Sequence, residues 1–353
     1  LRPMPQKKPD RATGLSVCHL IQLTITILNG VPSSERGYCS KFWRARQPPV
    51  LPCSLPRDMI QWAHRNRFPK RRFLPAMFFL PLLLLSLLLW VLWGNRTLLI
   101  HEIPLSLPGL PPAFDGMRIA QVSDLHNASF GKENRRLLQA LSQAKPHLIV
   151  LTGDLVDSRH TNLPRALAFA ARAAELAPTY FVPGNHEARL PQYPALKSGL
   201  EDTGVVVLED RSVPLCRDGE TITLLGLADP SFDKKRGLPG SPAELVSAKL
   251  RRLLPAATPC TILLSHRPEL MGVYAAHAVD LVFSGHTHGG QVRLPLLGGV
   301  IAPSQGLFPF YDAGVYVQGT TRLIVSRGLG NSIAPIRLNN RPELVVARLS
   351  AGQ

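Results

Sequence analysis

Apolar runs alternate with helical patterns through the middle of the chain. The runs at 117–123, 147–151 and 179–182 are short and continuous, which predicts buried strands. Between them, residues 132–144 and 163–176 are predicted helices, the first with leucines at helical spacing. This alternation of strand and helix predicts an α/β sheet.

The pattern becomes more strongly β farther along the chain. Three apolar runs, 205–208, 213–217 and 221–227, are separated by turn residues. A predicted helix at 242–254 is followed by five further strand candidates: 260–264, 279–283, 315–318, 321–326 and 343–349. We therefore expect the domain to close with a sheet of partly antiparallel character.

A long apolar run precedes this domain. Residues 73 to 93 are 21 consecutive positions without a charge, dominated by leucine. As a helix the run would be about 30 Å long, enough to cross a bilayer, and a buried core helix seldom lacks every charge over this length. In a cleaved signal peptide the apolar region ends after about 7 to 15 residues at a small-x-small site, whereas this run ends at Trp90, Trp93 and Gly94. We expect an uncleaved signal anchor.

The charges beside the apolar run predict its orientation. Arg96 is the only basic residue among the 20 that follow it, whereas the 20 before it hold six: Arg57, Arg65, Arg67, Lys70, Arg71 and Arg72. By the positive-inside rule, the N-terminus would lie in the cytoplasm and residues 94–353 on the extracytoplasmic side. The two tryptophans at the end of the run would then lie at the outer interface.

Composition divides the rest of the chain into three parts. Residues 1–72 are rich in Pro, Arg and Lys, which is typical of a basic, disordered arm. Residues 94–116 contain four prolines and favour a linker. The globular domain is then expected to span residues 117–350.

The formal net charge of +16 is unevenly distributed. Residues 1–93 carry a net +11 and residues 94–353 only +5, so the basicity belongs mainly to the N-terminal flank. A membrane surface explains this flank as well as nucleic acid does, and no basic patch with interleaved aromatics follows it. We expect a membrane, and no nucleic acid, as partner. The five cysteines form no CxxC pair, which argues against a thiolate metal site or a disulfide framework.

Polar residues follow the predicted strands at the point where each ends. In an α/β sheet, ligands bind outside the carboxyl ends of the strands, so these side chains are expected to share one site. They are Asp124, His126, Asp154, Asn185, His186, His266, His286 and His288. His286 and His288 could both face one cavity from a strand end or from the turn just past it.

Carboxylates and imidazoles together indicate a metal site. This mixture suits Mn, Fe or Zn better than Mg or Ca, which prefer oxygen alone. Eight such groups are too many for one ion. Two metals about 3.5 to 4 Å apart, sharing a bridging carboxylate, would fit them, as in many phosphatases and nucleases.

These residues fall into five ordered blocks. The blocks read Asp124-x-His126, Gly153-Asp154, Gly184-Asn185-His186-Glu187, His266 and Gly285-His286-x-His288. In this order, with strands before them, they resemble the calcineurin-like metallophosphoesterase superfamily over roughly residues 117–349. The continuation Gly289-Gly290-Gln291, the later Ser326-Arg327-Gly328-Leu329-Gly330 and the membrane-tethered layout are similar to membrane-associated bacterial phosphodiesterases and animal transmembrane proteins with a metallophosphoesterase domain. The resemblance implies a four-layer α/β-β/α sandwich of mixed sheets flanked by helices, preceded by one transmembrane helix.

The resemblance also implies the roles of the site residues. Two divalent or transition metal ions, of Mn, Fe, Zn or Co, would be bound. Their implied ligands are Asp124, His126 and His288 for the first, Asn185, His266 and His286 for the second, and Asp154 as the bridge. A water shared by the ions would become the hydroxide that attacks phosphorus in line. His186 would contact the phosphoryl oxygen or protonate the leaving group.

The expected activity is therefore metal-dependent hydrolysis of phosphate esters, with a phosphodiester as the expected substrate. Relatives that cleave UDP-2,3-diacylglucosamine in lipid A synthesis suggest an alternative, a pyrophosphatase acting on a lipid-linked substrate, against which the outward topology counts. A non-catalytic scaffold is a second alternative, although no ligand of the set is missing. The expected substrate is a phosphorylated small molecule or a lipid-linked phosphate.

Four further residues lie in or near the blocks without a decided role. Asp157 and Glu187 are expected to support the site or to lie on the surface. Arg267 and Arg293 flank ligand blocks, so they could bind substrate phosphate or be solvated.

Overall fold

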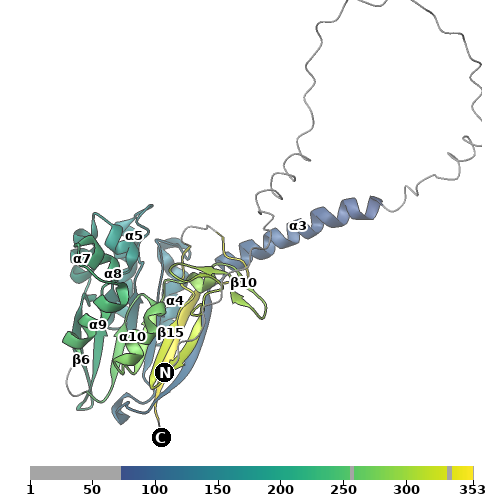
Figure 1. The fold of residues 1–353 in the computed structure, drawn as a ribbon. Coiled ribbons are helices and arrows are strands. Elements are labelled where there is room, and N and C mark those ends of the chain that lie inside the picture. Colours follow the sequence, from purple (N-terminus) through teal and green to yellow (C-terminus); the bar gives the residue numbers. More distant parts are fainter. Residues whose placement is uncertain (1–72, 255–257, 332–335, 353) are drawn as a thin grey trace, which may run out of the picture. The chain divides into compact units, whose positions relative to one another are not determined.

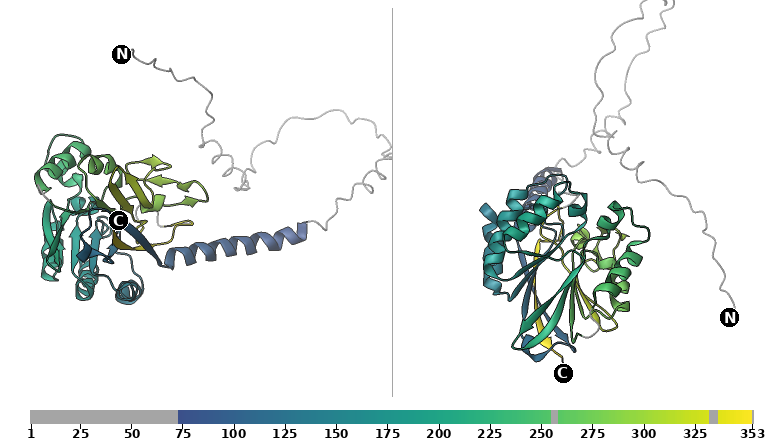
Figure 2. Two further views of the ribbon diagram at one scale, coloured as in Figure 1. Left: turned by 90° about the horizontal axis from the view of Figure 1, so that it is seen from below. Right: turned by 90° about the vertical axis from the view of Figure 1, so that its left-hand side faces the viewer.

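The computed structural model describes residues 73–254, 258–331 and 336–352. Two six-stranded sheets pack face to face, and helices cover the outer face of each (Figures 1 and 2). The expected four-layer α/β-β/α sandwich is thus confirmed. The disordered arm expected over residues 1–72 lies outside the described residues.

The first sheet is mixed, and its central strands are parallel. β2, β3, β4 and β5 run parallel to one another, whereas β16 is antiparallel to β2 and parallel to the edge strand β1. In spatial order the strands are β1 (Leu99–Leu107), β16 (Glu343–Ala351), β2 (Arg118–Val122), β3 (Leu148–Thr152), β4 (Thr179–Val182) and β5 (Val206–Val207).

The second sheet has a parallel centre and antiparallel edges. β15, β9, β8 and β7 are parallel, while β14 and β6 pair antiparallel at the two edges, which confirms the expected partly antiparallel closure. In spatial order the strands are β14 (Gly314–Gln318), β15 (Thr321–Val325), β9 (Leu281–Ser284), β8 (Thr261–Leu264), β7 (Glu220–Gly226) and β6 (Arg211–Arg217).

Helices shield the outer faces of both sheets. The first sheet is covered by α4 (Arg135–Ala144), α5 (Leu163–Leu176) and α7 (Tyr193–Asp202), and the second by α9 (Pro242–Leu253) and α10 (Met271–Ala276). N-cap residues fix where two of these helices begin. At α5 the Asn162 side chain accepts a hydrogen bond from the Arg165 N–H, and at α9 Ser241 forms a capping box with Glu244. Shorter helices are α6 (Asn185–Arg189), α8 (Pro230–Lys235) and four 3₁₀ turns at Pro112–Phe114, Lys132–Asn134, Pro268–Leu270 and His288–Gly290.

The main core lies between the two sheets. Ile119 and Val150 from the first sheet pack with Ile262, Phe283 and Ile324 from the second, all fully buried. Strands such as β3 and β8 are buried on both faces, which is why they appear in the sequence as continuous apolar runs. This packing brings the carboxyl ends of strands from both sheets to one edge.

The prediction of a linker over residues 94–116 is wrong for much of this range. β1 occupies Leu99–Leu107 and pairs with β16 along nine residues, and Phe114 is buried in the core. Pro104 is tolerated because β1 is an edge strand with one side unpaired. The burial of Ile103, Leu105 and Leu107 alternates with polar or proline positions, a strand pattern that the prolines concealed.

The apolar run forms one helix, α3 (Phe73–Arg96), which extends one turn beyond the expected end at Trp93. It is the one helix in the described part of the chain that is long and apolar enough to cross a membrane, and its leucines are exposed. The helix end is tied to the domain. The Asn95 side chain exchanges two hydrogen bonds with the Arg337 backbone, and Arg341 lies 5.1 Å from the ring centre of Trp93.

Candidate metal centre

Turns after five strands bring all eight predicted site residues together. Asp124 and His126 follow β2, Asp154 follows β3, and Asn185 and His186 open α6 after β4. From the other sheet, His266 follows β8, and His286 and His288 lie in the turn past β9. Every one of the eight is at most 7% exposed. The structure thus brings the eight residues to one place, each after a strand that the sequence also predicted.

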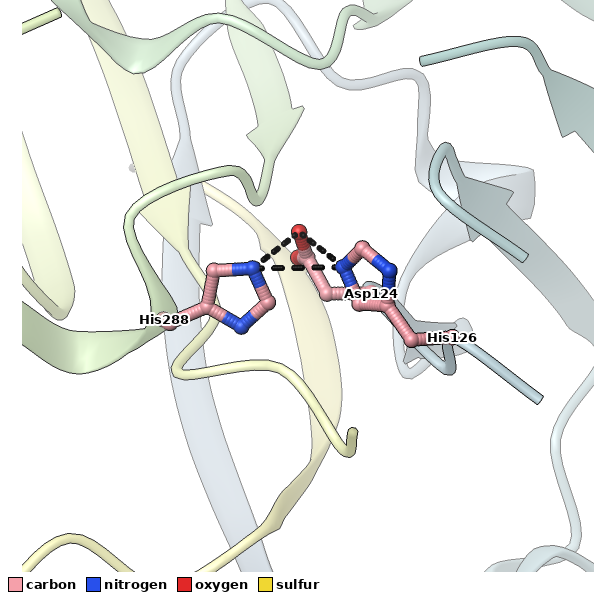
Figure 3. A group of neighbouring side chains, drawn as sticks. All are labelled: Asp124, His126 and His288. Atoms are coloured by element: carbon pink, nitrogen blue, oxygen red, sulfur yellow. Dashed lines mark hydrogen bonds and ion pairs between the residues drawn. The ribbon is translucent and has the colours of Figure 1, made fainter. Parts of the chain in front are cut away.

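Asp124, His126 and His288 form one cluster of candidate metal ligands (Figure 3). His288 Nε2 lies 3.5 Å from Asp124 Oδ1 and 3.2 Å from His126 Nε2. His126 Nε2 is 4.0 Å from the same Asp124 oxygen. Three ligand atoms from two sheets therefore converge on one point, as a metal ion would require.

A second cluster joins Asp154, His266 and His286. Asp154 Oδ2 lies 3.2 Å from His266 Nε2 and also 3.7 Å from His126 Nε2, a member of the first cluster. Asp154 is thus placed between the two clusters. This is the position that a bridging carboxylate would occupy.

Two further observations test whether these residues fit metal ions. The side-chain oxygen of Asn185 is buried and has no hydrogen-bond partner among the described residues. An unpaired buried acceptor is costly, and a cation would satisfy it. The Nδ1 atom of His266 donates to the Thr152 carbonyl at 2.8 Å, which leaves Nε2 facing the carboxylates, the usual orientation of a metal-binding histidine. The donor set therefore fits two divalent ions.

His186 forms a third group of candidate metal ligands with His126 and Asp154, which belong to the first and second clusters, and its Nδ1 atom is already hydrogen-bonded. Its Nδ1 accepts from the Ser158 N–H at 3.1 Å and is 3.5 Å from Asp157 Oδ1. Its ring meets that of His126 edge-on, with 4.5 Å between ring centres. Burial lowers the pKa of His186, so the ring is neutral, and the accepting Nδ1 leaves the proton on Nε2. His186 can therefore donate a hydrogen bond from Nε2.

Comparison with known proteins decides the family. The family model described as calcineurin-like phosphoesterase matches residues 117–290. The uncharacterized metallophosphoesterase YkuE of Bacillus subtilis is 31% identical over 256 residues, covering 71% of this chain and 84% of YkuE. The chain belongs to the calcineurin-like metallophosphoesterases.

Two further relatives of this metallophosphoesterase have more specific names. The phosphodiesterase YaeI of Escherichia coli is 30% identical over 66% of this chain and 82% of its own length. The bovine transmembrane protein with metallophosphoesterase domain is 30% identical over 69% of this chain and 55% of its own length. The chain is therefore a phosphoric ester hydrolase that uses divalent metal ions, and α3 together with the transmembrane-named relative indicates membrane association.

Burial and charge shape the ionisation of the metal-free centre. Burial opposes charge on Asp154 and His266, but their mutual attraction outweighs it, so the pKa of Asp154 is well below its usual value and that of His266 is raised to about 10. Burial raises the pKa of Asp124 to about 6. A protonated His266 cannot ligate a metal, so metal binding at this centre is accompanied by proton release.

The centre of the metallophosphoesterase is held in strained backbone. Five non-glycine residues of the set have a positive φ between 46° and 72°: Asp124, His126, Asp154, His286 and His288. Such conformations cost about 1–3 kcal/mol each and persist only where surrounding structure enforces them. Hydrogen bonds supply part of this enforcement, because the His286 N–H donates to both Asp124 carboxylate oxygens at 3.1 Å.

Glu187, whose role sequence reasoning left undecided, supports the centre. It is fully buried and accepts hydrogen bonds from the backbone N–H groups of Asp154, Val156 and Gly184. These bonds fix the turn that carries Asp154. Asp157, also undecided, lies against His186 as described above.

Arg337 was missed by sequence reasoning. Its guanidinium is buried, donates to the carbonyls of Arg327 and Gly330, and lies 3.4 Å from His288 Nδ1. The backbone N–H and carbonyl of Arg337 form hydrogen bonds with the Asn95 side chain at the end of α3. No motif surrounds Arg337, so no signal in the sequence pointed to it.

The two arginines that flank ligand blocks are neither free nor solvated. Arg267 forms two hydrogen bonds with the buried carboxylate of Asp229, and Arg293 pairs with Asp312 at 2.9 Å. Both side chains are largely buried. Their charges are therefore already matched within the domain.

Proposed function

We propose that this metallophosphoesterase hydrolyses phosphodiesters at a centre of two divalent ions. The observation that carries the proposal is the placement of Asp154 between two clusters of buried carboxylate and imidazole groups. Asp124, His126 and His288 would hold one ion, and Asn185, His266 and His286 the other, with Asp154 as the shared ligand. This mixture of oxygen and nitrogen donors suits Mn, Fe or Zn, and we propose Mn²⁺ as the first ion to test.

The protein and the ions have separate roles in this proposal. When bound, the ions would lower the pKa of a shared water and offset charge on the phosphoryl oxygens. His186, neutral and with its proton on Nε2, would donate a hydrogen bond to a phosphoryl oxygen, whereas protonating the leaving group would require its imidazolium form, which burial disfavours. The Ser158 N–H, which donates to Nδ1, would hold its ring in that orientation.

We further propose that α3 anchors the enzyme with its N-terminus in the cytoplasm. Six basic residues precede the apolar run and only Arg96 follows it closely, which supports this orientation. The catalytic domain would then act on the extracytoplasmic side, on a phosphorylated small molecule or a lipid-linked phosphate. A reporter fused to the C-terminus should read extracytoplasmic, and a cytoplasmic reading would reverse the orientation.

The activity is tested on the full chain purified in detergent. With Mn²⁺ added, it should hydrolyse bis(p-nitrophenyl) phosphate, and Asp154→Asn should lower kcat/KM about 100-fold or more because the shared ligand is lost. Asp202→Asn, at an exposed position on α7, is the matched control and should stay within about twofold of wild type. A chain that binds no metal and leaves the diester intact would refute the proposal.

A further inference from the structure

Two small hairpins beyond the His286–His288 turn expose an unusual amount of apolar surface. β10 (Arg293–Leu294) pairs with β11 (Gly298–Gly299), and β12 (Ile301–Ala302) pairs with β13 (Gly306–Leu307). Residues 294–311 contain no Asp, Glu, Lys or Arg. Seven large apolar side chains are exposed there: Leu294, Leu296, Leu297, Ile301, Leu307, Phe308 and Phe310. We call these seven side chains the apolar rim.

The backbone at the tips of the rim makes this composition more unusual. Leu296, in the β10–β11 turn, has φ 68° and is fully exposed, and Phe308, directly after β13, has φ 52°. Hairpin positions with positive φ normally hold Gly, Asn or Asp, because those residues adopt it at low cost. A bulky apolar residue in such a position is conformationally strained, and its exposed side chain is neither solvated favourably nor packed against the domain. Its presence indicates a partner for the apolar surface.

The rim lies beside the domain end of α3. The Asn339 side chain donates to the Arg293 carbonyl, Arg293 N–H donates to the Leu338 carbonyl, and the neighbouring Arg337 bonds Asn95 of α3. Figure 1 shows β10 close to this end of the helix. The hairpins are thus next to the residues at which the apolar helix meets the domain.

The surroundings of the helix end match a membrane interface. Trp90 and Trp93 of α3 line a hollow together with Arg327, Arg337 and Arg341. Tryptophans concentrate at the level of lipid headgroups, and the partly exposed Arg341 would be attracted to lipid phosphates there, whereas the Arg337 guanidinium is buried and bonded within the domain. The apolar rim therefore continues a surface that already carries the aromatic and basic residues of an interface.

The rim also reaches the metal centre. Ser304, in the turn of the β12–β13 hairpin, lies 3.4 Å from His286 Nε2 and accepts from Arg267 at 2.8 Å. One end of the hairpin pair therefore contacts a candidate metal ligand while the apolar side chains face outward. A bilayer in contact with the rim would lie close to the centre.

We propose that the apolar rim inserts into the leaflet that meets the C-terminal end of α3. The occupant of this surface is a phospholipid bilayer, because the rim is continuous with the membrane helix and carries no charge from 294 to 311. Insertion to a depth of about 5–10 Å is expected for apolar side chains of this kind. The inference rests on the membrane span of α3 proposed above and is independent of catalysis.

The test uses the full chain in vesicles of phosphatidylcholine and phosphatidylglycerol. Cys18, Cys39, Cys53 and Cys216 are replaced by Ser, while Cys260 stays because it is buried and burial raises the pKa of its thiol to about 12. A polarity-sensitive fluorophore is attached at Leu296→Cys, and in a second protein at Leu307→Cys. Both labels should be blue-shifted and quenched by lipids spin-labelled near the headgroup.

Two control positions make the result decisive. Leu238, an exposed leucine between α8 and α9, is the matched control, and its label should stay in water and unquenched. A label at Leu84→Cys, near the middle of the apolar run of α3, reports the span itself when it is read with lipids spin-labelled near the end of the acyl chain. If the label at 84 is quenched while those at 296 and 307 are not, the rim does not insert and the inference is overturned. If the label at 84 is unquenched, the span proposed for α3 fails first.

A protein partner would give a different signature. Labels at 296 and 307 that are shielded from water yet unaffected by the spin-labelled lipids would place a second protein surface on the rim. That outcome also overturns the bilayer as occupant.

Discussion

His286 and His288 are one residue apart, yet the structure directs them to different clusters. His288 lies with Asp124 and His126, whereas His286 lies with Asp154 and His266. The positive φ of both residues allows this divergence, because in an extended strand two such side chains would point the same way. The turn thus joins the two halves of the candidate centre.

Losing either histidine should therefore impair a different ion. His286→Ala and His288→Ala should each bind about one metal equivalent in place of two, and each should lose about 100-fold or more in kcat/KM. Metal analysis of the purified variants measures this. His160→Ala, at an exposed position, should keep both ions. If one variant loses both ions and the other loses none, the two-cluster assignment is wrong.

Gly285 leaves room for the ligand that faces it. A Cβ atom at this position would collide with the Ser123 hydroxyl and with Asp124 Oδ2. Gly285→Ala should therefore displace Asp124 and weaken metal binding by its cluster, with about 10-fold to 100-fold loss of activity. Gly272→Ala is the matched control, since nothing lies within 4 Å of its added Cβ and it sits inside α10. It should keep full activity and gain up to about 1 kcal/mol of stability.

Metal titration of the two glycine variants provides the measurement. Unchanged metal affinity in Gly285→Ala would mean that the Asp124 carboxylate is not needed where the structure places it.

The sequence predicted the site residues that belong to a motif directly after a strand. It did not predict a residue that reaches the site from outside such a motif. Asp124 and Asp154 come directly after apolar runs, so their meeting at a sheet edge follows from the fold. Arg337 reaches His288 from 49 positions farther along the chain, outside every motif identified in the sequence. Contacts of this kind depend on tertiary packing, which a single sequence does not specify.

At the scale of elements, strand β1 shows how proline can mislead. Its prolines suggested a linker, yet its alternating apolar residues complete the core beside β16. The hairpins β10–β13 were missed for a different reason, because strands of two residues are too short to show any period. Strands that are continuous apolar runs of four or five residues, such as β3 and β9, were predicted close to their observed ends.

The pairing of β1 with β16 makes a specific prediction about pH. His101 Nδ1 lies 2.9 Å from Glu343 Oε1, and this hydrogen bond, opposed by partial burial, raises the pKa of His101 above 6.5. A raised pKa means that the folded protein binds the proton more tightly. The stabilisation is therefore complete below the unfolded value of 6.5 and is lost as pH rises through the folded value.

His101→Gln should consequently be less stable than wild type at about pH 5.5, by at most about 1 kcal/mol because the imidazole is partly exposed. The difference should fade by about pH 8.5. The free energy of unfolding of both proteins, measured at the two pH values, checks this, with His160→Gln as control. A difference that does not change with pH would exclude the ion pair as its cause.

For the whole molecule, the order of strands and helices predicted the layered architecture. Apolar runs buried on both faces require cover on both sides, and the helical segments between them provide it. The pairing of the sheets face to face, by contrast, came from the family resemblance, because strand order across two sheets depends on long-range contacts. The metal centre lies where strands of both sheets end because the two sheets pack face to face.

The central claim is that two metal ions at this centre are required for phosphodiester hydrolysis. It is tested most directly by stripping the full chain with a chelator and adding Mn²⁺ stepwise while metal binding and bis(p-nitrophenyl) phosphate hydrolysis are followed together. We predict that about two equivalents bind and that activity returns with the second. Hydrolysis that survives complete metal removal, or full activity with one equivalent bound, would show that two ions are not required.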